Sequence, residues 1–141
     1  MINKILYSSN SEEWETPQDL FDKLNKEFYF TMDVAASHDN TKCPFYFTKE
    51  RDGLKHEWRG VVWCNPPYGR GIGKWVKKCS EYRGLSVMLI PARTDTKWFH
   101  DYIYHNPRAE IRFLKGRLHF NNSKNAAPFP SMVVVFYKEG V

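Results

Sequence analysis

Short apolar runs alternate with amphipathic stretches along this chain, and that order constrains its fold more than any other feature. Apolar residues recur at helical spacing after residue 16 and again over residues 73–82. Runs rich in β-branched and aromatic residues predict strands at residues 30–36, 43–48, 61–64, 85–90, 111–120 and 132–137. Strands separated by helices predict an α/β sandwich on a mostly parallel sheet, and the two consecutive strands at the end predict an antiparallel C-terminal pair.

Polar and proline residues mark the expected element ends. Thr16 is predicted as the N-cap of the first helix, with Pro17 at its first helical position and Asp19 as the acid of a capping box. Pro91 is expected to end the strand at 85–90. Asp95 is then expected to cap the next helix.

The length and the cysteine and histidine content limit the number of domains and the kinds of site that the chain can form. A chain of 141 residues fits one domain, residues 1–141, in which polar residues 1–13 form an N-terminal arm. No apolar run reaches the roughly 18 residues of a membrane span, so no membrane partner is expected. The three cysteines are odd in number and widely spaced, which argues against a disulfide framework or a zinc site and favours a reducing cytoplasm. The five histidines show no ligand spacing either, so no metal is expected.

The charge favours a polyanionic partner, most simply nucleic acid, although a soluble domain with spare lysines has the same balance. The formal net charge is +5 at pH 7. Five basic residues lie between residues 102 and 125, opposed by one acid, Glu110: Arg108, Arg112, Lys115, Arg117 and Lys124. We expect Lys115, Arg117 and Lys124 to meet phosphates, with a solvated basic face as the equal alternative.

The tetrapeptide Asn65-Pro66-Pro67-Tyr68 follows the predicted strand at 61–64 and indicates chemistry on a planar amino group. The lone pair of such a nitrogen is delocalised, and two acceptors beside it draw the nitrogen toward sp³ geometry. Asn65 offers a side-chain carbonyl and Pro66 a main-chain carbonyl, while the two prolines fix the backbone. Tyr68 is expected to offer an open ring face on which a base stacks. A simple turn after a strand is the weaker alternative.

Two predicted strand ends are expected to share one cleft. Ligands of open parallel sheets bind at the carboxyl ends of the strands. The stretch 33–37 and the tetrapeptide both lie at such ends, so they open onto one cleft if their strands are neighbours.

The tetrapeptide resembles the catalytic motif of S-adenosylmethionine-dependent amino-group methyltransferases. The chain from about residue 14 to 137 resembles a narrower group, the phage-type DNA N6-adenine methyltransferases with an Asn-Pro-Pro-Tyr motif. The matching stretches are residues 14–17, 33–37, 52–54, 63–68, 89–96, 116–120 and 127–132. This resemblance implies a compact Rossmann-like methyltransferase sandwich with S-adenosylmethionine as methyl donor.

The resemblance also implies a cofactor site. The Thr16-Pro17 turn is expected to hold the amino-acid end of the cofactor at a helix N-terminus, with Trp14 covering the ligand. An ordinary capped helix is the alternative. The family's first cofactor motif falls on Asp33, Ala35, Ala36 and Ser37, with alanines in place of the usual glycines. Asp52 is expected to accept a hydrogen bond from the cofactor adenine, and a plain turn aspartate is the equal alternative. Glu50 is expected to bind the ribose, and Asn65 to line the same site.

The leading reading is therefore a site-specific adenine N6-methyltransferase acting on a flipped base of duplex DNA. An RNA or protein-glutamine methyltransferase with the same motif remains open, and so does an inactive DNA-binding homologue. We expect a monomer or homodimer in the cytoplasm of a bacterial host. No separate target-recognition domain is expected. Loops such as 121–130 or a dimer would read the target, or the enzyme would have low sequence specificity.

Overall fold

The computed structural model of the protein describes residues 13–140, so that most of the predicted N-terminal arm, residues 1–12, lies outside the described residues. The elements are, in chain order, α2 (Gln18–Phe28), β1 (Met32–Ala36), β2 (Phe45–Thr48), η1 (Gly53–Lys55), β3 (Val62–Cys64), α3 (Ile72–Glu81), β4 (Ser86–Pro91), η2 (Phe99–Ile103), β5 (Ala109–Phe113) and β6 (Ser131–Phe136).

One sheet organises the molecule, with strand order β2-β1-β3-β4-β6-β5. The first four strands of that order pair in parallel. Strand β6 runs antiparallel to β4 and to β5, so the predicted C-terminal antiparallel pair is confirmed. A mostly parallel sheet with an antiparallel edge is compatible with the expected Rossmann-like fold, and it collects the loops after β1, β3, β4 and β5 at one end.

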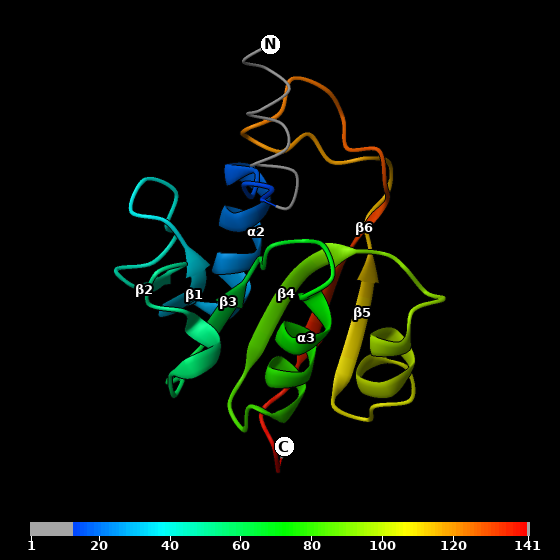
Figure 1. Cartoon of the computed structure of the whole chain (residues 1–141). Coiled ribbons are helices and arrows are strands. Elements are labelled where there is room, and N and C mark those ends of the chain that lie inside the picture. Colours follow the sequence, from blue (N-terminus) through cyan, green and yellow to red (C-terminus); the bar gives the residue numbers. More distant parts are fainter. Residues whose placement is uncertain (1–12, 141) are drawn as a thin grey trace.

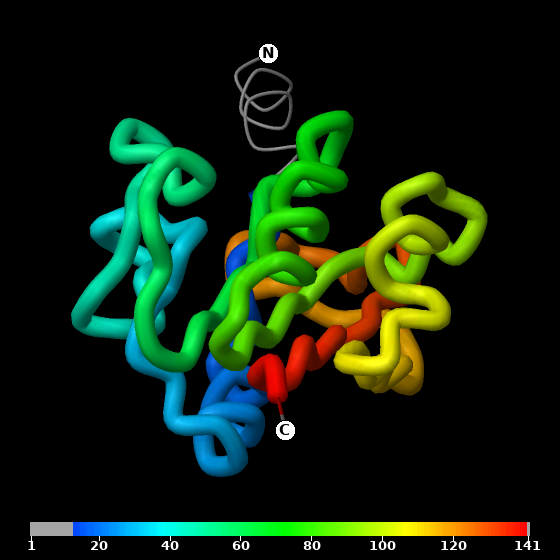
Figure 2. Tube along the Cα trace, turned by 90° about the horizontal axis from the view of Figure 1, so that it is seen from below, coloured from blue at the N-terminus to red at the C-terminus, as the bar shows by residue number. Residues whose placement is uncertain are grey.

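The two α-helices cover opposite faces of the sheet (Figures 1 and 2). In α2, Phe21, Leu24 and Phe28 are buried at helical spacing, and the Phe21 ring packs edge-on against Trp63 of β3. In α3, Trp75, Val76 and Cys79 are buried on one stripe. Every residue of β3, β4 and β6 is buried, as expected for neighbouring interior strands of a sheet that is covered on both faces.

Several of the predicted helix and strand ends differ in the structure. Thr16 does not cap α2, because Pro17 occupies the cap position and Asp19 binds the N–H of Leu20 instead of completing a capping box. Strand β4 includes Pro91, which pairs with Ser131 and so continues the sheet by one residue.

The segment after β4 is not a capped α-helix but the π-helix η2, whose residues Phe99 and Ile103 are buried. Asp95 makes no cap. The hydroxyl oxygen of Thr96 accepts from the N–H of Phe99 instead, at 3.3 Å.

The strand predicted at 111–120 ends early. Strand β5 stops at Phe113, and Gly116 adopts a φ of +75°, a left-handed backbone that ends regular pairing. The segment 114–130, called the roof loop below, therefore contains no strand. It is drawn in yellow-orange to orange in Figure 1 and lies beside the first described residues of the chain.

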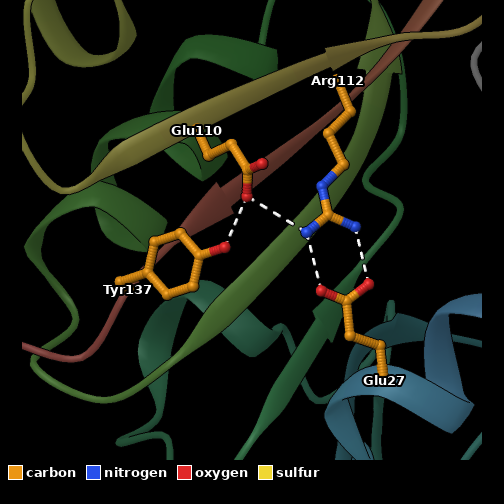
Figure 3. A network of polar contacts seen from close by, with 4 residues as sticks. All are labelled: Glu27, Glu110, Arg112 and Tyr137. Atoms are coloured by element: carbon orange, nitrogen blue, oxygen red, sulfur yellow. Dashed lines mark hydrogen bonds and ion pairs between the residues drawn. The ribbon is translucent and has the colours of Figure 1, made fainter.

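Two arginines of the predicted basic edge hold the fold together. Arg112 forms a two-pronged ion pair with Glu27 of α2, with both N–O distances at 2.7 Å, and it also reaches Glu110 (Figure 3). Tyr137 donates to Glu110 in the same network. Arg108 donates to the main-chain oxygens of Ser80, Tyr82 and Tyr137. Neither guanidinium is free for phosphates.

Within the described residues, no helix is long and apolar enough to cross a bilayer. The thiols of Cys43, Cys64 and Cys79 are buried and free.

Candidate active site

A cleft of about 750 Å³ opens at the carboxyl ends of β1 and β3. These strands are direct neighbours, with Asp33 opposite Trp63. The stretch 33–37 and the residues Asn65, Pro66 and Pro67 line the same cleft, which confirms the prediction that the two strand ends share one.

Asn65 lies on the cleft wall with its amide orientation fixed. Its Nδ2 donates to the main-chain oxygen of Trp14 and, at 2.9 Å, to Oγ1 of Thr16. Both hydrogens of the amide nitrogen are thereby used. Oδ1 accepts from the hydroxyl of Tyr68 at 2.8 Å, and an amide oxygen has a second lone pair for another donor.

Tyr68 is placed differently from the sequence-based expectation. Only 5% of its surface is exposed, it does not line the cleft, and its hydroxyl also lies 2.9 Å from the oxygen of Leu89. Burial raises the pKa of its phenol well above the usual range. The open ring face predicted for base stacking is absent, because the ring packs edge-on against Phe120 and Phe129.

The roof loop packs against Trp14 and Tyr68, the two aromatic residues that contact Asn65. Its residues Phe120 and Phe129 are buried and also meet the ring of Trp14 edge-on, at centroid distances of 5.4 and 5.2 Å. The two phenylalanine rings therefore contact both Trp14 and Tyr68. Sequence reasoning missed them, although two phenylalanines flanking a polar loop are a signal for a segment that folds back on the core.

Asp33 is buried and shapes the loop after β1. Its carboxylate accepts from the N–H groups of Lys42, at 2.9 Å, and Ala35, at 3.4 Å. Burial nonetheless raises its pKa from 3.8 to about 6, against the lowering effect of those two hydrogen bonds. These hydrogen bonds fix the conformation of the loop after β1.

The loop after β1 is further closed by local hydrogen bonds between Ser37 and Asn40, at 2.7 and 3.2 Å. Lys42 reaches back from it to Gln18 at the start of α2. His38, Asn40 and Lys42 line the cleft but were not predicted. Their polar side chains just after a predicted strand end were the available signal.

The turn at Asp52 forms the opposite wall. Asp52 has a φ of +59° and caps η1 by accepting from the N–H of Leu54 at 3.0 Å, so a turn role is confirmed. A Cβ on Gly53 would lie 2.1 Å from the oxygen of Val34, so only glycine lets this turn approach β1. Glu50 also lines the cleft and is exposed.

Nearly all residues predicted to bind the cofactor meet at this cleft. Pro17 is the exception, since it is buried as the cap residue of α2 and does not line the cavity. The residues that do line it are Trp14, Thr16, Asp33, Ala35, Ala36, Ser37, Glu50, Asp52 and Asn65.

Cationic side chains gather at the same end of the sheet. Lys115, Arg117 and Lys124 are exposed on the roof loop between β5 and β6. The topology adds Arg70, after β3, and Arg93, after β4, because these loops leave the same edge. Among the described residues none of the five has an ion-pair partner. We call these five residues the cationic rim. The position of Arg93 directly after a predicted strand end was a signal that it could face the cleft, whereas no local pattern pointed to Arg70.

Comparison with known proteins places the chain among DNA-modifying enzymes. The model of a family described as DNA N-6-adenine-methyltransferase (Dam) matches residues 4–139. A DNA N-6-adenine-methyltransferase of Haemophilus phage HP1 is 28% identical over 139 residues, covering 91% of this chain and 80% of the relative. A protein of the same description from Escherichia phage T1 is 35% identical over 92 residues, covering 61% of this chain and 38% of the relative. A putative methyltransferase, YfdM, of Escherichia coli K12 is 35% identical over 65 residues, covering 40% and 71% respectively.

Proposed function

The chain belongs to the DNA N-6-adenine-methyltransferase (Dam) family, and from this premise we propose that Asn65 and Pro66 receive the N6 amino group of a flipped adenine in the cleft between β1 and β3. The enzyme is a DNA adenine methyltransferase. The proposal concerns how its residues perform that reaction.

The observation that carries the proposal is the hydrogen-bonding state of Asn65. Because Trp14 and Thr16 take both Nδ2 hydrogens, Oδ1 is the atom left to face a donor. The main-chain oxygen of Pro66 accepts no hydrogen bond from the described residues, and proline has no N–H to compete for the substrate. Two acceptors held in place before the substrate arrives cost no reorganisation during the reaction.

These acceptors act on the electrons of the amino group. An adenine amino nitrogen is a weak nucleophile while its lone pair is shared with the ring. Hydrogen bonds from its two N–H groups to Oδ1 of Asn65 and to the oxygen of Pro66 pull the nitrogen out of that planar state and free the lone pair. Tyr68 does not contact the substrate in this arrangement. It is a positioning residue whose hydroxyl donates to Oδ1 of Asn65.

The cleft suits S-adenosylmethionine, which supplies a methyl group on an electrophilic sulfonium sulfur. Its volume of about 750 Å³ is within the roughly 300–1,000 Å³ typical of small-molecule sites. Ala35, Ala36 and Gly53 give the cleft a wall of small residues. Asp52 and Glu50 line the same cleft and would bind the amino and hydroxyl groups of the adenosine part, and Trp14 and Thr16 also line it.

We propose that the described residues work as a single methyltransferase domain in which the cationic rim and the roof loop take the place of a separate target-recognition domain. Duplex DNA carries one phosphate charge per about 1.7 Å along its axis, and a rim of unpaired cations around the cleft provides the counter-charge. Base flipping into the cleft then brings the adenine to Asn65.

The test is transfer of labelled methyl from S-adenosylmethionine to a pool of duplex DNA, with RNA and a glutamine-containing protein as competing substrates. We expect label at N6 of adenine in DNA alone. Label in RNA or in glutamine would replace the proposed substrate, and no label in any of the three would refute the proposal.

Asn65→Ala gives the residue-level test. It is expected to lower kcat by about 100-fold or more, as for loss of one preorganised hydrogen-bonding group. The dissociation constant of S-adenosylmethionine, measured by calorimetry, should change little. The matched control is Asn125→Ala, an exposed asparagine whose side chain has no hydrogen bond within the described region.

A further inference from the structure

Three hydrogen bonds join the roof loop to the segment 13–15, which is distant in sequence. Oδ1 of Asn122 accepts from the N–H of Glu15 at 2.9 Å, and its Nδ2 donates to the oxygen of Glu13 at 2.9 Å. The N–H of Asn121 donates to the oxygen of Glu15 at 3.0 Å. A single side chain, that of Asn122, thus holds the main chain on both sides of Trp14.

The residue held in this way determines the orientation of Asn65. The oxygen of Trp14 accepts one Nδ2 hydrogen of Asn65, and Thr16 accepts the other. An asparagine amide presents either its oxygen or its nitrogen to a substrate, depending on which neighbours surround it. Displacement of the Trp14 carbonyl would remove one of the two contacts that keep Oδ1 turned toward the incoming amino group.

The same loop faces solvent with its cations. Lys124 is two residues beyond Asn122, and both Lys124 and Arg117 are exposed. The inner side of the loop is anchored by Phe120 and Phe129, which are buried against Trp14. One segment therefore contains the proposed DNA contacts, the clamp on the Trp14 main chain and the ring contacts with the Trp14 side chain.

We propose that Asn122 is a positioning residue for methyl transfer, which holds Trp14 so that the Trp14 carbonyl orients the amide of Asn65. This inference rests on the proposed function of Asn65. It adds that the loop meeting DNA also sets the geometry of the residue that binds the adenine. Asn122 itself touches neither the cofactor nor the reacting atoms.

The test compares Asn122→Ala with Asn125→Ala, which makes the same chemical change three residues further along the loop. In Asn122→Ala we expect kcat at saturating DNA and cofactor to fall by about tenfold or more, because small displacements of reacting groups are costly. KM for DNA should stay within about threefold of wild type, since the cations remain. Asn125→Ala should keep the wild-type kcat at saturating DNA, and because Asn125 lies on the proposed DNA-binding loop, any effect of this variant should appear in KM for DNA. Assays run well below the unfolding midpoint of each variant.

Asn122→Asp covers the case in which the alanine variant does not fold. It keeps the shape and the acceptor for Glu15 but removes the donor to Glu13, and it should also lower kcat. A variant that loses only thermal stability and keeps kcat within about threefold of wild type would overturn the proposal. So would an equal loss in Asn125→Ala, or a loss confined to KM for DNA.

Side-chain amide NMR separates this inference from the proposed function. Both Nδ2 hydrogens of Asn65 are bonded in the wild-type protein, so their exchange with water should be slow. Faster exchange in Asn122→Ala but not in Asn125→Ala would support the positioning role even if the wild-type protein did not methylate DNA. Unchanged exchange in Asn122→Ala would refute the positioning role even if the wild-type protein were active.

Discussion

The hydroxyl of Tyr68 lies 2.8 Å from Oδ1 of Asn65 and 2.9 Å from the main-chain oxygen of Leu89. Both neighbours only accept, and a phenol has one hydrogen to give. The two contacts therefore share one hydrogen, and Asn65 is not held by Tyr68 alone. The firm contacts of its amide are those to Trp14 and Thr16 on the nitrogen side.

Tyr68→Phe tests this division of roles. Loss of the hydroxyl leaves the buried Leu89 oxygen without its side-chain partner, which costs about 1–3 kcal/mol of unfolding free energy. Asn65 keeps its nitrogen-side contacts, so kcat should fall by about tenfold, clearly less than in Asn65→Ala. Urea unfolding and steady-state kinetics measure the two effects, with the exposed Tyr29→Phe as control. A loss equal to that of Asn65→Ala would mean that the hydroxyl acts on the substrate directly.

Asp33 makes the stability of the protein depend on pH. Its folded-state pKa of about 6 is above the ordinary value of 3.8, because burial disfavours the charged form. A raised pKa means that the folded state binds the proton more tightly. The stabilising contribution of protonated Asp33 to the unfolding free energy is complete below pH 3.8 and is lost as the pH rises through about 6.

The corresponding measurement is the unfolding free energy of wild type minus that of Asp33→Asn, by urea titration across pH. This difference should decrease by about 2 kcal/mol between roughly pH 4.5 and pH 8. The subtraction removes the titration of all other groups. A difference that is flat, or that increases with pH, would contradict the raised pKa.

The cationic rim should be visible in the salt dependence of DNA binding. Each phosphate contact contributes a slope of about −0.9 to the plot of log K against log salt. Arg93→Gln and Arg117→Gln should each make the slope shallower by about that amount, measured by fluorescence anisotropy with a duplex. Lys26→Gln, in the last turn of α2 away from the cleft, is the matched control. If Arg93→Gln and Arg117→Gln had the same salt slope as Lys26→Gln, the cationic rim would be excluded as the DNA-binding surface.

Ser131 is a site where the protein can gain stability. Among the described residues, its Oγ is the buried side-chain polar atom that lacks any hydrogen-bond partner. Replacing an unsatisfied buried hydroxyl with a methyl group removes a desolvation cost, so Ser131→Ala should raise the unfolding free energy by about 1 kcal/mol. Thermal and urea unfolding test this, and a clear loss of stability would show that the hydroxyl has a partner.

The sequence predicted the sheet, its antiparallel edge and most of the cleft, because these features follow from local patterns. Alternating apolar runs specified the strands, and Asp33 and Asn65 were found because polar residues at parallel strand ends converge. The errors came from contacts distant in sequence. Thr16 fits the pattern of a cap, yet its hydroxyl binds Asn65, 49 residues away. Arg112 belongs to the basic edge predicted from the sequence, but its charge is neutralised by Glu27, 85 residues away. No local pattern encodes such partners.

The roof loop also has an evolutionary consequence. Its inward residues, Phe120, Ala127 and Phe129, are fixed by the core, and Asn122 is fixed by its hydrogen bonds to Glu13 and Glu15. Outward residues such as Arg117, Lys124 and Asn125 are exposed instead. Mutations at the outward positions can accumulate at little cost to folding. A population of such enzymes could therefore diversify the DNA sequences it prefers while every member inherits the same reaction centre, and a laboratory library restricted to those positions would explore the same range.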